Sequence, residues 1–242
     1  MIKKTGLLYG IVFFSAVSAG MPPFDYGFLE KELECGAANH VEFKQVSDTP
    51  IVYRTWGVWN MKYPAMRVAD VALDLYNYSA IFRHVYRCER ILGPSIRVSP
   101  LGTWYVEGRA AVARVWSIGN IDTLAWTDST RLRLIASQNE NRYLEGRWSG
   151  NKSGWFNYRT YGMHCAAFIV AVGKDSCRVG IVAQGLVKQA MPQWLIRLAM
   201  KIILPHLLAD LEKEVKRRAK LRLQKPMPWY DHWLNGVRRL FL

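Results

Sequence analysis

Charged residues are scarce in this sequence of 242 residues, and acidic residues are the scarcer kind. Only 21% of the residues are charged, with 19 Asp and Glu against 33 Lys and Arg, while half are apolar. This balance excludes a disordered or fibrous chain and an acidic solvating tail. We therefore expect a folded globular protein with a sizeable core, whose net charge of +14 favours an anionic partner such as nucleic acid or a membrane surface.

Motifs of catalysis and of metal binding are also lacking. No Ser lies in a nucleophile elbow, no Cys lies beside a motif His, and no glycine-rich loop could cradle a phosphate. The His residues show no paired metal-ligand spacing (His40, His84, His164, His206, His232). The sequence therefore predicts no catalytic residue, no metal site and no cofactor. A recognition motif for nucleic acid is missing too, so we expect no nucleic-acid partner.

Cysteines number only four, and no two of them have the two-residue spacing of a zinc or redox motif (Cys35, Cys88, Cys165, Cys177). Four cysteines in a chain of this length are more typical of small core residues than of a disulfide framework. A turn at 173–176 would place Cys165 and Cys177 several residues out of register, so we do not expect them to pair.

Long apolar runs are absent except near the N-terminus. There, Lys3 and Lys4 precede an uncharged stretch from Gly6 to Ala19, which is the basic, apolar and small-residue order of a secretory signal. The run is shorter than the roughly 20 apolar residues that span a bilayer, although a membrane anchor is the alternative. We predict a signal peptide over 1–19, hence export, to the periplasm if the source is a Gram-negative bacterium.

The remaining sequence predicts one domain over 47–224, between a loosely packed leader (20–46) and a basic, aromatic tail (225–242). The leader has no sustained hydrophobic period. A strand is expected over 50–59, followed by a helix over 64–75 and a second short helix over 78–83.

Strand-like runs and turn signals alternate through the middle of the chain, and a long helix over 192–223 ends the domain. The turns predict one antiparallel meander. Because nothing else could cover the apolar side of that sheet, we predict an α+β fold in which a curved antiparallel sheet wraps around the C-terminal helix. The expected strands are 85–92, 104–118, 130–137, 143–148, 155–172 and 178–187, and the expected turns are 139–141, 150–154 and 173–176.

Three stretches resemble a known superfamily. MRVADVALDLYNYSAIFRHVYRCERI (66–91) is similar to the opening of START and polyketide-cyclase-like (Bet v 1-like, SRPBCC) domains, and PQWLIRLAMKIILPHLLADLEKEVKRR (192–218) is similar to their closing helix. EGRWSGNKSGWFNYR (145–159) resembles the hairpin between them. The resemblance implies the helix-grip fold, with a cavity that holds a lipid or other apolar ligand.

Strand alternation suggests which residues would line such a cavity. If 104–118 is one strand, a single inner face carries Trp104, Val106, Gly108, Ala110, Val112, Arg114, Trp116 and Ile118. Gly108 and Ala110 are too small to fill an interior, and Ala183 and Gly185 repeat the pattern. Either a ligand or side chains of the closing helix would fill that space. The resemblance favours the ligand.

Arg114 is a charge on this apolar face, where it must be paired or reach solvent. Three explanations stay open: a buried carboxylate neutralises it, a ligand head group does so, or a bulge near 116–120 turns it outward. With the apolar first half of the closing helix, the alternation leads to a predicted set of ligand-binding residues: Val112, Arg114, Trp116, Leu134, Trp148, Ala183, Leu198, Ala199, Ile202 and His206.

The C-terminal region is strongly basic. Residues 192–242 contain 11 basic and 4 acidic residues, which is half of the positive excess of the whole chain. Such a stretch is typical of a solvated face or of contact with anionic lipid head groups. We predict a monomeric lipid-binding protein that carries a lipid at or between membranes. The alternatives are a cavity enzyme on an aromatic or polyketide-like substrate, and a scaffold whose cavity is closed.

Overall fold

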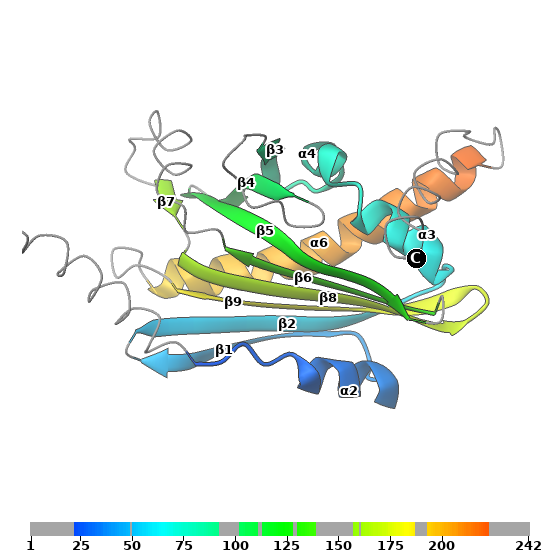
Figure 1. Ribbon diagram of the computed structural model, residues 1–242, viewed down its shortest axis with the longest axis horizontal. Coiled ribbons are helices and arrows are strands. Elements are labelled where there is room, and N and C mark those ends of the chain that lie inside the picture. The colour runs from blue at the N-terminus through cyan, green and yellow to red at the C-terminus, as the bar shows by residue number, and fades with distance from the viewer. Residues whose placement is uncertain are drawn as a thin grey trace, which may run out of the picture.

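Within the residues that this computed structural model describes, one sheet of nine strands curves around a long C-terminal helix (Figure 1). The structure describes residues 22–48, 50–91, 102–110, 113–127, 130–138, 157–159, 161–186 and 193–222. The strands are β1 (His40–Asp48), β2 (Ile51–Met61), β3 (Val85–Ile91), β4 (Thr103–Ala110), β5 (Ala113–Thr127), β6 (Arg131–Gln138), β7 (Asn157–Arg159), β8 (Tyr161–Gly173) and β9 (Ser176–Leu186). The helices are α2 (Gly27–Cys35), α3 (Ala65–Ala72), the 3-10 helix η1 (Leu75–Asn77), α4 (Tyr78–Ile81) and α6 (Gln193–Arg222).

The predicted α+β architecture is confirmed. The strands lie in the order β1-β2-β9-β8-β6-β5-β4-β3, with β7 paired in parallel to β5. The expected turn at 173–176 joins β8 to β9, where Gly173 pairs with Ser176. Pro64 immediately precedes α3, as a residue that suits a helix start. α6 runs through Pro205 as one helix.

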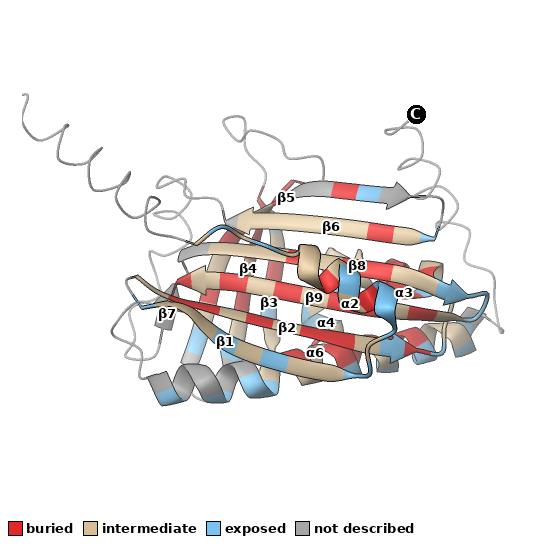
Figure 2. Cartoon of the chain, turned by 90° about the horizontal axis from the view of Figure 1, so that it is seen from below, coloured by how far each residue is buried: buried red, intermediate tan, exposed pale blue. Residues whose placement is uncertain are grey.

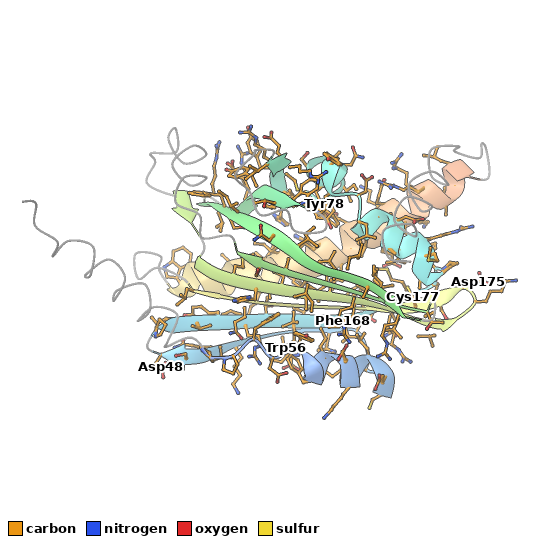
Figure 3. All side chains as sticks on the ribbon, viewed as in Figure 1. Asp48, Trp56, Tyr78, Phe168, Asp175 and Cys177 are labelled. Atoms are coloured by element: carbon orange, nitrogen blue, oxygen red, sulfur yellow. The ribbon has the colours of Figure 1, made fainter. Side chains whose placement is uncertain are left out.

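Asp48 and Asp175 mark opposite ends of this sheet (Figure 3), and we call these the Asp48 end and the Asp175 end. α6 begins at the Asp48 end and runs toward the Asp175 end, where α3 lies beside it (Figure 1). The concave face is the one that α6 covers, and the convex face is the opposite one.

The main core lies between the concave face and the second half of α6. Leu204, Leu208, Leu211 and Val215 are buried and recur at helical spacing, so they form one stripe on the helix. Leu132, Ile169 and Val179 from three neighbouring strands pack against this cluster. Each fully buried aliphatic side chain of this kind contributes about 1.5–3 kcal/mol.

The segment expected to be a loosely packed leader instead supplies α2 and β1. Leu29 and Leu33 of α2 are fully buried on the convex face, in a cluster with Phe168 and Val182. Figure 2 shows α2 lying against this face of the sheet. A Cβ on Gly180 would lie 2.8 Å from Leu33 Cδ1, so a glycine is needed for this close approach. The N-terminal segment is therefore an integral part of the fold.

Two ion pairs also connect α2 to the convex face. Arg131 and Arg133 of β6 contact Glu34 and Glu30, with nitrogen to oxygen distances of 2.7 and 2.9 Å. Because residues 131 and 133 alternate with Leu132, the same strand presents charges to α2 and an apolar side chain to α6.

The region 104–118 is a hairpin and was wrongly predicted as one strand. β4 and β5 pair from Ala110 with Ala113 onward, so a two-residue connection at 111–112 reverses the chain. Trp104 consequently faces the concave side, in a cluster with Cys88 and Ile121, whereas Trp116 joins Tyr105 on the convex side. The sequence of the connection contains no Gly, Pro, Asn or Asp, so no turn residue indicated the reversal.

Several predicted features lie outside the described residues: the signal peptide (1–19), the strand over 143–148, the turns at 139–141 and 150–154, and the tail (225–242). Within the described ranges, no helix has both the length and the apolar character needed to cross a membrane. None of the four cysteines forms a disulfide bond. In the β8–β9 register, Cys165 lies opposite Ala183 and Cys177 lies opposite Ala171, so the two cysteines are out of register, as predicted.

Candidate functional site

The concave face carries a row of small side chains toward the Asp48 end. Ala136, Cys165, Ala183 and Thr55 are successive cross-strand partners on β6, β8, β9 and β2, and we call them the small-residue row. Ala136, Cys165 and Ala183 are partly exposed, whereas Leu132 and Ile169, nearer the Asp175 end, are buried. The concave face is thus closely covered at one end and accessible at the other.

Two glycines on the concave face differ in how closely other atoms approach them. A Cβ on Gly57 would lie 2.8 Å from the backbone oxygen of His40 and 3.5 Å from Leu204 Cδ2, so α6 and β1 leave no room there. A Cβ on Gly185 would approach nothing closer than Met163 at 3.7 Å, which is an ordinary van der Waals contact. The face is therefore filled at Gly57, whereas a methyl-sized group at Gly185 would fit without a clash.

The described polar groups around the small-residue row are neutral. The Thr55 hydroxyl donates to the backbone oxygen of Glu42 at 3.0 Å. Tyr53, the partner of Gly185, is buried and stacks on Phe43 with ring centres 5.1 Å apart, and its hydroxyl has no hydrogen-bond partner in the structure described. Desolvation by the surrounding side chains raises the pKa of the Cys165 thiol to about 12, so this group stays protonated. The surface suits an apolar molecule with at most neutral polar groups.

The first half of α6 has an apolar stripe that faces solvent. Trp194, Leu198 and Ile202 are 66%, 42% and 37% exposed, and their spacing of four residues aligns them along one side of the helix. Exposed apolar side chains that line up in this way mark an interaction surface more often than scattered ones do.

Solved structures share this architecture. Human STARD10 is 15% identical, with a TM-score of 0.62, over 90% of this chain and 89% of that one. Human StAR-related lipid transfer protein 5 is 14% identical with a TM-score of 0.54, over 74% and 82% of the two chains. Zhui aromatase/cyclase from Streptomyces sp. R1128 is 10% identical with a TM-score of 0.50, over 69% and 96%. No protein-family model and no curated protein matches the sequence.

The chain has the START-like helix-grip fold. The predicted resemblance is therefore confirmed at the level of the fold, and the identities are too low to transfer any residue's role.

Within this START-like fold, polar contacts hold α6 in place. Asp210 accepts hydrogen bonds from Arg83, and Glu212 accepts one from the Trp59 indole at 3.2 Å. Burial by itself would raise the pKa of Asp210, but the hydrogen bonds and charge of Arg83 hold that pKa below its ordinary value. These contacts connect the second half of α6 to β2 and to the residues that follow α4.

His206 of α6 belongs to the same set of contacts. Its Nδ1 lies 2.7 Å from His84 Nε2, and the two rings are nearly parallel. Because His84 Nδ1 faces the backbone oxygen of Arg109 at 3.1 Å, that nitrogen carries a proton. His206 thus connects α6 to the segment between α4 and β3.

A groove of about 920 Å³ lies between α3, α4 and the second half of α6. Of the described residues that line it, nine of fifteen are charged, and Arg83, Arg217 and Arg218 pair there with Asp210, Glu214 and Asp74. None of the predicted ligand-binding residues within the described ranges lines this groove. Its ion pairs make it a poor site for an apolar molecule.

The structure brings together only some of the predicted ligand-binding residues. Leu134 and Ala183 lie on the concave face, while Leu198 and Ile202 belong to the exposed apolar stripe. Ala199 lies in the same half of α6. Val112 and Trp148 lie outside the described residues.

Arg114 and Trp116 were wrongly placed on the concave face. The hairpin turn directs both to the convex face, where Arg114 Nη1 lies 3.6 Å from Oε1 of the buried Glu107. Of the three explanations, the carboxylate is the one observed, and no register shift interrupts the β4–β5 pairing.

Tyr53, Gly57 and Met163 were missed. The signal for them was the alternation along β2, because residues 53, 55 and 57 share the face whose partners include Ala183 and Gly185.

Proposed function

We propose that this chain binds a lipid or another apolar molecule on its concave face, next to the small-residue row, and carries it at or between membranes. The observation that supports the proposal best is that Ala136, Cys165 and Ala183 of the small-residue row are partly exposed, whereas Leu132 and Ile169 on the same face are buried. The lipid-transfer proteins with the same fold add to it.

Burial of apolar surface would drive binding, at about 0.8 kcal/mol for each methylene removed from water. The described residues of the small-residue row and its neighbours carry no charge, so the site favours a molecule whose buried part is neutral.

A membrane surface is the second part of the proposal. The exposed apolar stripe would enter the lipid interface, and Lys201 on the same half of α6 is exposed beside it. The strongly basic C-terminal region would attract anionic head groups at about 1 kcal/mol per basic residue near the surface. Export of the chain and a monomeric state complete this proposal.

Native mass spectrometry of the purified protein tests ligand binding, together with uptake of a fluorescent lipid. Ala183→Trp and Gly185→Leu should reduce uptake at least about tenfold, because they occupy the open part of the concave face. Ala125→Trp is the matched control, since Ala125 is exposed on the opposite face of β5. Uptake that is equal in all four proteins would refute the assigned site.

Vesicle sedimentation tests the membrane contact. The variant with Ser at 194, 198 and 202 should lose binding to vesicles that contain phosphatidylglycerol, and binding by the parent should weaken with salt because exposed charges are screened beyond about 10 Å at 0.1 M. Unchanged binding of the serine variant would contradict a role for the stripe. N-terminal sequencing of protein from the source cell tests export, and an intact Met1 would contradict it.

The cavity enzyme is the second candidate. The likeness to an aromatase/cyclase favours it, as does the His84–His206 pair, which is an acid–base group connected to α6. A bound species whose mass changes during incubation, and does so in the parent but not in His206→Gln, would favour this candidate over lipid carriage.

A further inference from the structure

Arg109 and Arg114 are direct cross-strand partners on the convex face, at the Asp48 end of the sheet. Like charges directly opposite each other in an antiparallel pair destabilise the sheet. Arg109 is exposed, and the Arg114 side chain is 47% exposed. A structural role alone therefore does not account for two arginines at this position.

Both guanidinium groups meet at one aromatic ring. The Cζ atoms of Arg109 and Arg114 lie 4.5 and 5.2 Å from the centre of the Tyr86 ring, and Tyr86 is 52% exposed. The ring face attracts both cations and holds them near each other at the protein surface. Tyr86 thus offsets part of the repulsion without neutralising either charge.

Only one carboxylate among the described residues balances these two cations. Glu107 is 2% exposed and lies 3.6 Å from Arg114, and it also accepts a hydrogen bond from the Tyr105 hydroxyl at 2.8 Å. Arg109 has no carboxylate partner in the described part of the chain. The cluster therefore keeps a surplus positive charge, located at Arg109.

We propose that Arg109, Arg114 and Tyr86 form a binding site for a phosphate group. Two guanidinium groups can donate paired hydrogen bonds to different oxygens of one tetrahedral anion, which a carboxylate with two oxygens cannot match. An anion between the arginines also removes the repulsion between their charges. The site lies on the opposite face from the small-residue row and does not depend on ligand binding there.

The phosphate can belong to a lipid head group or to a free ion. The β4–β5 hairpin and the first half of α6 lie at the same end of the molecule (Figure 1), so a head group is within the reach of a membrane-facing surface. A lipid head group and a free phosphate ion would bind through the same phosphate oxygens, so the choice of probe has to distinguish them.

Arg109→Gln is the informative variant, because it removes the surplus charge and leaves Glu107 with its Arg114 partner. Lys174→Gln is the matched control, since Lys174 is also exposed but lies in the turn at the Asp175 end. Arg109→Gln combined with Arg114→Lys keeps a cation beside Glu107 but removes the second guanidinium group and its paired donors.

The probes are inorganic phosphate and pyrophosphate, measured by thermal stabilisation and by titration calorimetry, and vesicles of phosphatidylcholine with or without phosphatidic acid. We expect the affinity of the parent for at least one phosphate probe to fall about tenfold or more in Arg109→Gln and further in the double variant, but to stay within about twofold in the control. Without an anion, Arg109→Gln should melt at or above the parent, because the repulsion is gone.

A response to free phosphate assigns a soluble ligand, and a response to phosphatidic acid alone assigns a head group. Equal affinities of the parent and Arg109→Gln for every phosphate probe would overturn the proposal, as would an equal stabilisation of the parent by acetate. Lipid uptake at the concave face should be unchanged in Arg109→Gln, so failure of this site and failure of the proposed function give different results.

Discussion

Asp210 on α6 accepts hydrogen bonds from two groups of Arg83, its backbone N–H at 3.0 Å and its guanidinium Nε at 2.9 Å. Arg83 follows α4, so this contact connects the closing helix to the short helices on the same side of the sheet. The position of α6 over the concave face therefore depends on polar contacts as well as on the buried stripe formed by Leu204, Leu208, Leu211 and Val215.

Asp210→Asn should lower the melting temperature by a few degrees at neutral pH. The pKa of Asp210 is depressed in the folded state, so its contribution is complete above the unfolded pKa of about 4 and is lost as the pH falls through the folded value. The difference between the variant and the parent should therefore disappear in acid. Thermal melts across pH check this, with the exposed Asp175→Asn as the control; a difference that persists at the lowest pH would contradict it.

Gly57→Ala should destabilise the protein by about 1–3 kcal/mol, because the added Cβ would meet the His40 backbone and α6. Gly185→Ala should change stability by less than about 0.5 kcal/mol, since its Cβ has room. Urea unfolding of the two variants compares them directly. Equal losses would mean that the concave face is equally filled at both positions.

Tyr53→Phe should leave stability unchanged or raise it by about 1 kcal/mol, because the buried hydroxyl makes no hydrogen bond in the structure described. Tyr78→Phe is the matched variant. The Tyr78 hydroxyl donates to the backbone oxygen of Ala72, and burial raises its pKa above the ordinary value, so it stays a donor. Its loss should cost about 1–3 kcal/mol. Denaturant unfolding in which Tyr53→Phe is the more damaging change would contradict this assignment.

Leu33→Ala should cost about 2–5 kcal/mol, because Leu33 is fully buried between α2 and the convex face. Lys31→Ala is the control, since Lys31 is exposed on the same helix. Chemical denaturation measures both. A neutral Leu33→Ala would indicate that α2 is dispensable, as the interpretation of residues 20–46 as a loose leader had implied.

The order of the helices and of most strands could be predicted from the sequence, because hydrophobic periodicity is a local property. α3 after Pro64, the β8–β9 turn at 173–176 and α6 each carry their signal within a few residues. α2 was missed although Leu29 and Leu33 are four residues apart and Gly36, with a φ of +79°, ends the helix.

The sequence by itself therefore determined the fold class, the β8–β9 hairpin and the closing helix of this protein. Only the tertiary structure decided which face each residue of β4 and β5 occupies, because a two-residue connection without turn residues inverts the alternation of everything after it. That inversion moved Arg114 from the expected ligand site to a partnership with Glu107, Tyr86 and Arg109. Burial and charge pairing arise between strands and helices that are distant in sequence, and no local pattern encodes them.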